Sequence, residues 1–447
     1  MIWIGITLYT ILLLLIAFQF RHHTGSDEFL MAHREAGWIK VSAGLFTLIG
    51  GGEFVTLASL GFVYGWGAIA LFLGYALGFI FLGLIAGRLR ENSSIKRYVS
   101  LPDYVHDKFG AASGLIVFMF SFLAFFALLM LQFATAGAVI SPFTDLSYEQ
   151  IVIYIAVVVT AYLLIGGFKA VLVTDVVQAV VMAILLPALL LYIFLEKSVG
   201  FENLSGIETL PLALWASLVF TGFFVVCASA DVWQRAYAAK SDKVAKIGFV
   251  VGAFGFLLFG FVIVSIGIAA HQFGVTDANS AFVQVMTSTL TPVLTLVVTL
   301  MVLSAIMSTA DTETFLLTGL VQRELQRYPL FRSLARLTSS VSGVRLLMVI
   351  LSSASIVFAI KYSSLVDIYT WLLSALVVIS PIILFSLFWH ASSVGMFLSL
   401  LANTIVFVVL TGTGILTLDN IYLISIPGIV FYTISLVFRK QNLPIRN

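Results

Sequence analysis

Charged residues are scarce in this chain: Lys, Arg, Asp and Glu together make up 10% of its 447 residues, whereas hydrophobic residues make up 61%. A surface of that composition must mostly face lipid, so a soluble protein is excluded and a polytopic integral membrane protein is predicted. Cysteine is represented by Cys227 alone, which excludes an internal disulfide and fits a small core residue. Long polar segments are also lacking, so we interpret residues 1–447 as one transmembrane domain.

Apolar runs fill most of the sequence, and about thirteen of them are long enough to span a membrane. The predicted fold class is therefore an all-α polytopic membrane protein with about thirteen transmembrane helices. The first run has no basic segment before it, so we interpret it as a retained helix rather than a secretory signal. The runs are expected near residues 2–20, 38–65, 68–90, 112–141, 149–166, 170–196, 211–231, 245–271, 291–321, 341–360, 364–389, 393–411 and 419–438.

Lys and Arg are distributed unevenly between the two sides that these runs define. With the N-terminus outside, 20 of the 23 basic residues fall in cytoplasmic segments, Arg345 lies at a helix start, and the external loops keep only Lys197 and Lys361. Cytoplasmic segments of membrane proteins are enriched in Lys and Arg, so an external N-terminus and a cytoplasmic C-terminus are predicted. Short loops favour a bacterial inner membrane. Because topology explains the basic residues, the net charge of +2 gives no indication of nucleic-acid binding.

The second run contains Gly50, Gly51 and Gly52, followed directly by Glu53. Each glycine lowers helix stability by about 1 kcal/mol relative to alanine, so a break in the helix is predicted there. Unwound backbone inside a membrane must line a cavity or protein, because its polar groups need partners. The alternative is a packing face of small residues. The carboxyl of Glu53 would be costly on a face that only packs.

The ninth run places Ala305, Ser308 and Thr309 on one helix face, so that one carbonyl and two hydroxyl oxygens point the same way. A neutral set of oxygen ligands suits a weakly held monovalent cation better than calcium. The alternative is that both hydroxyls bond the carbonyls of their own helix. Asp311 and Glu313 favour the first interpretation, because carboxyl groups inside a membrane indicate an ion or solute pathway.

A third group of polar residues follows Gly166 and Gly167, which are expected to form a tight cytoplasmic turn between two helices. Asp175 and Gln178 lie about one turn apart on the helix after it. A buried carboxylate there needs a cation, a role in proton transfer or a cage of hydrogen bonds. Alternatively, Asp175 lies close enough to the membrane interface to be solvated.

Several separated motifs, taken together, resemble the sodium:solute symporter family over residues 25 to at least 330. They are GSDEFLMAHREAGW (25–38), the glycine-rich second helix, LPDYVHDKFG (101–110), YLLIGGFKAVLVTDVVQ (162–178), WQRAYAAKSDKVAK (233–246) and AIMSTADTE (305–313). The resemblance implies the leucine-transporter fold, with two inverted five-helix repeats. These would be helices two to six (38–196) and seven to eleven (211–389), with an extra N-terminal helix (1–20) and two C-terminal helices (393–438).

The resemblance also implies cation sites. The family's sodium site matches backbone carbonyls at the break of the second helix and the polar stripe of the ninth helix, which here are Phe46, Ile49, Ala305, Ser308 and Thr309. Some members hold a second sodium nearer the cytoplasm. Its counterpart in this chain would be a second cation site formed by Asp175, Ser308, Asp311 and Thr312.

The solute is less constrained by the resemblance. Leu48 stands where family members with known substrates have a polar residue, and Glu53 stands where other members contact solute. An acidic side chain there would pair with an amine or carry a proton. The seventh-helix stretch TGFFVVCASADVWQR lacks the polar cluster of sugar carriers, so a sugar is not expected. The substrate-binding candidates are Glu53, Gln132, Thr221, Phe224, Ser229, Tyr369 and Trp371.

The sequence therefore predicts a secondary active symporter that imports a small organic solute with Na⁺ as coupling ion. An enzyme is not expected, because the chain shows no nucleophile–base arrangement and no dinucleotide-binding glycine fingerprint. Two alternatives stay open. One is a proton-coupled carrier of the same fold that uses Glu53, Asp175 and Asp311, and the other is a transporter-like solute sensor that acts with a partner.

Overall fold

The computed structural model describes residues 2–22, 29, 35–90, 98, 100–196, 209–289 and 291–441. Within these ranges the ordered elements are helices, and the β-contact present is an isolated bridge between Ala36 and Ala239. The predicted all-α class is confirmed. Lys197, expected in an external loop, and most of the motif at 25–38 lie outside the described residues.

Ten helices in the described part of the chain are long and apolar enough to cross a membrane, or up to eleven if one bent pair forms a single span. The chain is thus a multi-pass membrane protein, although the expected number of thirteen spans is not confirmed. Two of the ten spans change direction sharply. Gly167, with φ 63°, interrupts α9 (Tyr148–Glu196), and Gly65, with φ 56°, separates α4 (Gly51–Tyr64) from α5 (Ile69–Leu84). Glycine adopts positive φ at little cost, which explains both turns.

The remaining long helices lie close to the apolar runs expected from the sequence. They are α1 (Ile2–Gln19), α8 (Ala111–Ile140), α12 (Asp242–Ala269), α14 (Pro292–Arg327), α16 (Val341–Lys361), α17 (Leu365–Ser386), α18 (Ser393–Gly412) and α19 (Ile426–Gln441). Shorter helices connect them, namely α7 (Leu101–Phe109), α13 (Ala281–Thr289) and α15 (Arg332–Thr338), together with 3₁₀ turns at Gly65–Ala68, Ser141–Phe143, Ala270–Phe273, Ala278–Ser280, Pro329–Phe331 and Ile421–Ser425.

Two of the apolar runs form broken helices. The first is α3 (Trp38–Phe46) followed by α4, with residues 47–50 outside both helices, as the glycine run predicted. The second is α10 (Leu212–Ala228) followed by α11 (Ala230–Ala238), which bends by 49° at Ser229. The sequence analysis did not predict this second break.

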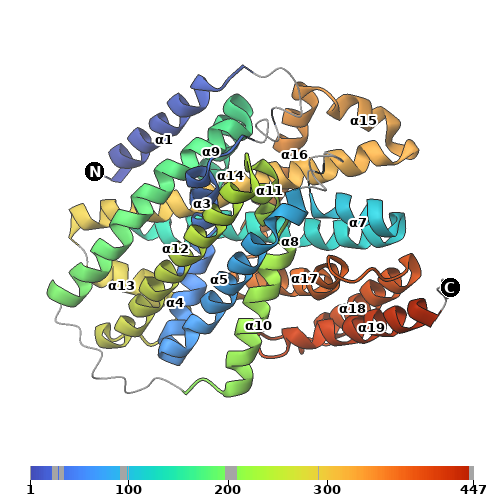
Figure 1. Ribbon diagram of the computed structural model, residues 1–447. Helices are drawn as coiled ribbons and strands as arrows, with labels where there is room; N and C mark the ends of the chain where they lie inside the picture. Colours follow the sequence, from blue (N-terminus) through green and yellow to red (C-terminus); the bar gives the residue numbers. More distant parts are fainter. Residues whose placement is uncertain are drawn as a thin grey trace.

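The helices form two groups. Helices α3, α4, α5, α10 and α12 pack against one another, whereas α8, α9, α14 and α16 form a second set of mutual contacts. Figure 1 shows α4, α5 and α12 running side by side, with α1 at one side of the molecule and α18 and α19 at the other. Helix α1 packs on α9, and α17 contacts both α8 and α10. The two broken helices therefore bring their breaks into the interior between the groups.

Helices α5 and α10 approach each other at the level of their backbones. A Cβ added at Gly74 would lie 2.3 Å from the carbonyl oxygen of Val219, and one at Gly222 would lie 2.4 Å from the carbonyl oxygen of Leu71. Small residues allow such close packing between membrane helices, where van der Waals contact supplies much of the association energy.

We predict that Gly222→Ala separates α5 from α10, because the new methyl group meets backbone atoms that cannot move aside alone. The expected loss of stability is about 1–3 kcal/mol, measured as a lower thermal midpoint of the purified protein. Gly412→Ala is the matched control, since a Cβ there meets nothing within 4 Å. Equal midpoints for the two variants would contradict the close contact.

Candidate functional site

The break between α3 and α4 lies against the polar stripe of α14. Ser308 Oγ and Thr309 Oγ1 each lie 3.1 Å from the carbonyl oxygen of Thr47, inside the break. Ser308 Oγ is also 3.0 Å from the carbonyl oxygen of Ala305. All four residues are buried. Two hydroxyls and two carbonyls, all neutral oxygen groups, are therefore gathered where two helices from different groups meet.

The carbonyl that faces the hydroxyls belongs to Thr47, whereas the resemblance had implied those of Phe46 and Ile49. Phe46 ends α3, and its ring stacks on that of Phe259 with the ring centroids 4.0 Å apart. Ile49 is fully buried in the break. The structure thus places both residues at the predicted position and adds Thr47 as an oxygen group that the sequence analysis missed. The signal for it was present, because any carbonyl in an unwound segment needs a partner.

The glycine run both breaks the helix and forms a close packing face, which the sequence had left as alternatives. The N–H of Gly51, at the start of α4, donates to Gln132 Oε1 at 2.8 Å, so this side chain from α8 caps the helix. A Cβ at Gly50 would lie 2.4 Å from the Gln132 amide nitrogen, and one at Gly52 would lie 2.4 Å from Leu131. The glycines therefore break the helix and also let α8 approach it closely. Gln132, expected to contact solute, holds the broken end in place.

A small cavity of about 50 Å³ lies beside the two broken helices. Glu53, in the first turn of α4, lines it and is 5% exposed, and its Oε2 has no hydrogen-bond partner. Ser229 and Asp231, at the second break, line the same cavity. The rest of the wall is largely apolar and aromatic: Leu48, Tyr75, Phe79, Phe125, Leu128, Val225, Val226, Val232, Phe256, Leu372, Leu373 and Leu376.

The position expected to hold a second cation contains the guanidinium of Arg235. Its Nη2 donates to Asp175 Oδ2 at 2.7 Å and to Thr312 Oγ1 at 2.8 Å. The Arg235 side chain is 1% exposed and that of Asp175 is fully buried. Nearby, the hydroxyl of Tyr162 donates to Asp311 Oδ2 at 2.8 Å. The structure brings Asp175 and Thr312 together as predicted, but the positive charge between them is the guanidinium of Arg235.

Arg235 corrects one part of the sequence analysis, which placed this residue in a cytoplasmic segment. In the structure it lies on α11, after the 49° bend at Ser229, and all residues of that short helix are buried. The stretch Ser229-Ala230-Asp231 was the available signal, because serine followed by an acidic residue is typical of a helix start. A new helix start after an apolar run would have predicted the break and the burial of Arg235.

Acidic groups far outnumber basic ones in the buried interior that the structure describes. Away from the predicted cytoplasmic side, one basic side chain, that of Arg235, accompanies five buried carboxyl groups. Both carboxyl oxygens of Glu313 lack a hydrogen-bond partner. Buried charges are stable only when they are paired or neutralised. The five carboxyl groups are those of Glu53, Asp175, Asp231, Asp311 and Glu313.

Three of the remaining solute candidates lie in the interior. The hydroxyl of Tyr369 lies 2.9 Å from that of Tyr75, which lines the cavity. Thr221 is buried and its hydroxyl has no hydrogen-bond partner. The carbonyl of Phe224 accepts a hydrogen bond from the hydroxyl of Ser380. Neither Thr221 nor Phe224 is among the residues that line the cavity.

Trp371 is a correction to the predicted set. Its side chain is 39% exposed, and its ring lies edge-on to that of Tyr362 with the centroids 6.5 Å apart. Tyr369, two residues earlier on α17, points into the protein instead. Residues two apart on a helix are about 200° apart around its axis, so the two side chains lie on opposite sides of α17.

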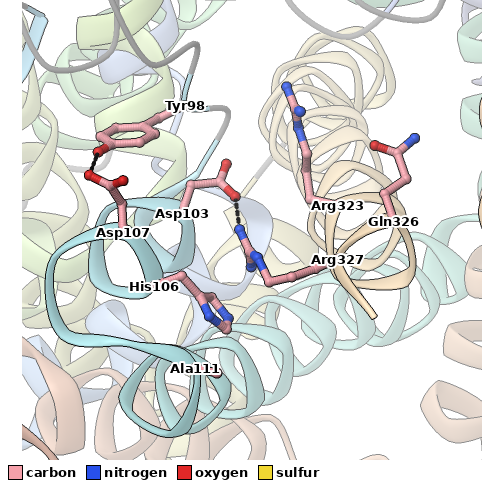
Figure 2. A pocket seen from close by; sticks show the side chains of 8 residues that line it. All are labelled: Tyr98, Asp103, His106, Asp107, Ala111, Arg323, Gln326 and Arg327. Atoms are coloured by element: carbon pink, nitrogen blue, oxygen red, sulfur yellow. Dashed lines mark hydrogen bonds and ion pairs between the residues drawn. The ribbon is translucent and has the colours of Figure 1, made fainter. Parts of the chain in front are cut away.

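A larger surface hollow of about 510 Å³ lies where α7 meets the end of α14. Figure 2 shows Asp103 and Arg327 pointing toward one another there, with the carboxylate and guanidinium 2.7 Å apart. Arg327 also contacts Glu324 at 2.8 Å, and His106 lies 3.2 Å from the same carboxyl group. These contacts tie the connecting helix α7 to α14 at the predicted cytoplasmic side, away from the broken helices.

Comparisons with known proteins agree with the motifs. Residues 29–210 match the model of the sodium:solute symporter family. A sodium/proline symporter of Haemophilus influenzae is 32% identical over 145 residues, covering 31% of this chain and 28% of that protein. Another, from Staphylococcus aureus, is 24% identical over 356 residues, covering 73% of this chain and 68% of that protein. The alignments thus span less than a third of the first relative and about two thirds of the second.

Among solved structures, a Na⁺-coupled sialic acid symporter in a substrate-bound, outward-open state superposes with a TM-score of 0.79 over 98% of both chains. The sequence identity is 14%, so this likeness concerns the fold. The fold is that of leucine-transporter-type membrane carriers. Residues 29–210 are therefore similar to the sodium:solute symporter family, as the motifs indicated.

We predict that Arg235→Gln and Asp175→Asn each destabilise the protein by about 3–5 kcal/mol, because each leaves the opposite charge buried and unpaired. The double variant removes both charges and is expected to recover part of that loss. Thermal or denaturant unfolding of the wild type, the two single variants and the double variant measures the coupling free energy between the two side chains. If the two losses simply add in the double variant, the ion pair is not the interaction that holds these side chains.

Proposed function

We propose that this chain is a sodium-coupled symporter that imports a small organic solute by alternating access across a cell membrane. The observation that carries the proposal is the contact of Ser308 and Thr309 with the unwound Thr47 carbonyl. Discontinuous membrane helices of this kind expose carbonyl oxygens that coordinate cations near the middle of the bilayer. The relatives named for proline and sialic acid support a small organic solute.

The proposed sodium site consists of the hydroxyls of Ser308 and Thr309 and the carbonyls of Phe46, Ile49 and Ala305, with Thr47 beside them. Every ligand is neutral, so a single positive charge is held weakly enough to be released where sodium is scarce. Sodium bound here would join α3 and α4 to α14, which belong to different helix groups. It would favour the outward-open arrangement and raise solute affinity by thermodynamic linkage, and its release inside would reset the carrier.

We further propose one coupling sodium rather than two. A cation at Asp175 and Thr312 would have to displace the guanidinium of Arg235, which already donates to both side chains at 2.7 and 2.8 Å. In this interpretation Arg235 supplies the positive charge that the second site, composed of Asp175, Ser308, Asp311 and Thr312, would otherwise require.

The two breaks also support the proposed repeats, 38–196 and 211–389. The first break, at residues 47–50, and the second, at Ser229, both lie in the first helix of their repeat. We retain the predicted orientation, with the N-terminus outside and the C-terminus in the cytoplasm of a bacterial cell, on the distribution of Lys and Arg.

The test compares the thermal stability of purified protein in sodium and in potassium at equal ionic strength. Anything that binds the folded state alone raises the unfolding midpoint, so sodium is expected to stabilise the wild type and potassium is not. In the Ser308→Ala, Thr309→Ala double variant, the sodium concentration for half-maximal stabilisation is expected to rise at least tenfold. Thr318→Ala is the control, since the Thr318 hydroxyl donates to the Thr314 carbonyl of its own helix.

Two outcomes would contradict the proposal. Unchanged half-saturation in the double variant would show that sodium binds elsewhere. Indifference to sodium together with strong dependence on pH would favour proton coupling through Glu53, Asp175 and Asp311, with the hydroxyl pair serving structure alone.

A further inference from the structure

We infer that the transported solute carries an ammonium group, and that Glu53 and Asp231 hold this group between the two broken helices. The inference rests on the proposed transport function and names the chemical class of its solute. Its central observation is that a buried carboxyl with an unpaired oxygen lines the interior cavity, and that a second buried carboxyl lines the same cavity.

Glu53 is placed by the break in the first helix. It is the third residue of α4, whose N-terminal end is fixed by the Gly51–Gln132 hydrogen bond at 2.8 Å. Its side chain is 5% exposed, and Oε2 has no hydrogen-bond partner. A buried carboxylate without a partner is costly, so a cationic ligand or a proton must complete this position.

Asp231 occupies the equivalent place at the second break. It is the second residue of α11, and its Oδ1 accepts the N–H of Val232 at 2.7 Å and the hydroxyl of Ser229. Open helix N-termini attract anions. Here a carboxyl group of the chain already occupies the first turn of each broken helix, so both ends present negative charge to the cavity. An anionic group of a solute would be repelled, and a cationic group would be attracted.

The walls of the cavity suit an organic cation better than a metal ion. Tyr75, Phe79, Phe125 and Phe256 line it, and aromatic faces attract ammonium groups. Among the described residues of the lining, none is basic. The present volume of about 50 Å³ holds a water or two, whereas solute pockets typically measure about 300 Å³ or more. The helices must therefore separate to admit the solute, and alternating access supplies that movement.

A proton on Glu53 would satisfy its carboxyl equally well, and the two cases differ in what they recognise. An ammonium site discriminates between a solute with a positive nitrogen and a neutral analogue of the same shape. A site that only carries a proton does not discriminate between them, because a protonated carboxyl group has no negative charge to attract the positive nitrogen.

The experiment measures the unfolding midpoint of the purified full-length protein in sodium, with three pairs of probes: choline against dimethylbutanol, putrescine against butanediol, and valine against its hydroxy-acid analogue. Each pair differs mainly in the presence of a positive nitrogen. At least one probe with a positive nitrogen is expected to raise the midpoint beyond sodium alone, with an apparent affinity at least tenfold higher than that of its partner without that nitrogen. If both members of every pair act alike, the inference is overturned.

Variants locate the effect. Glu53→Gln and Asp231→Asn are each expected to weaken the amine's apparent affinity at least tenfold while the sodium response remains. Glu324→Gln is the matched control, because it makes the same change at the cytoplasmic end, where Glu324 contacts Arg327 and His106. Preference for the amine is expected to persist in this control. Undiminished preference in Glu53→Gln would overturn the assignment.

The same data separate this inference from the proposed function. Stabilisation by sodium without any discrimination between amines and neutral analogues would leave sodium coupling intact and refute the ammonium site. If sodium does not stabilise the wild type at all, the proposed function is refuted instead. The wild-type comparison needs no variant, so poor folding of Glu53→Gln would not prevent the test.

Discussion

Away from the predicted cytoplasmic side, five carboxyl groups of the described residues are buried with one guanidinium, and much of the arrangement around the two breaks depends on how that imbalance is met. Arg235 neutralises part of it through its 2.7 Å contact with Asp175. Glu53 and Asp231 line the cavity, and both carboxyl oxygens of the buried Glu313 lack a hydrogen-bond partner. Among the described residues of the cavity lining, none is basic. Because an unpaired buried charge is costly, such an interior requires further neutralisation, which the proposals above assign to sodium, an organic ammonium or a proton.

The two broken helices are the structural means by which the proposed function would hold those cations. Each break frees backbone groups at the centre of a membrane protein, and these groups persist only where other protein groups satisfy them. At the first break, Ser308 and Thr309 meet the Thr47 carbonyl, and Gln132 caps the new helix end. At the second, Ser229 and Asp231 begin α11, which carries Arg235 into the interior. The proposed sodium site, the internal ion pair and the cavity thus all lie at the two breaks.

The first break was predictable because three consecutive glycines are a strong local signal. The facing hydroxyls were predictable from helical periodicity, since Ala305, Ser308 and Thr309 must share a face. The second break depends on Ser229, a single polar residue at the end of a long apolar run, and this weak signal was overlooked. Arg235 was misplaced as a consequence, because positive residues near helix ends are usually cytoplasmic. Trp371 was misjudged because residue type does not determine which side of α17 faces the cavity.

The proposed mechanism requires that sodium binds at the first break and that the guanidinium of Arg235 occupies the second cation position. Equilibrium binding of radioactive sodium to the purified protein tests this claim most directly. We expect one saturable sodium ion per chain, displaced by unlabelled sodium and not by potassium. Absence of saturable binding would contradict the sodium site, and two ions per chain would contradict the role assigned to Arg235.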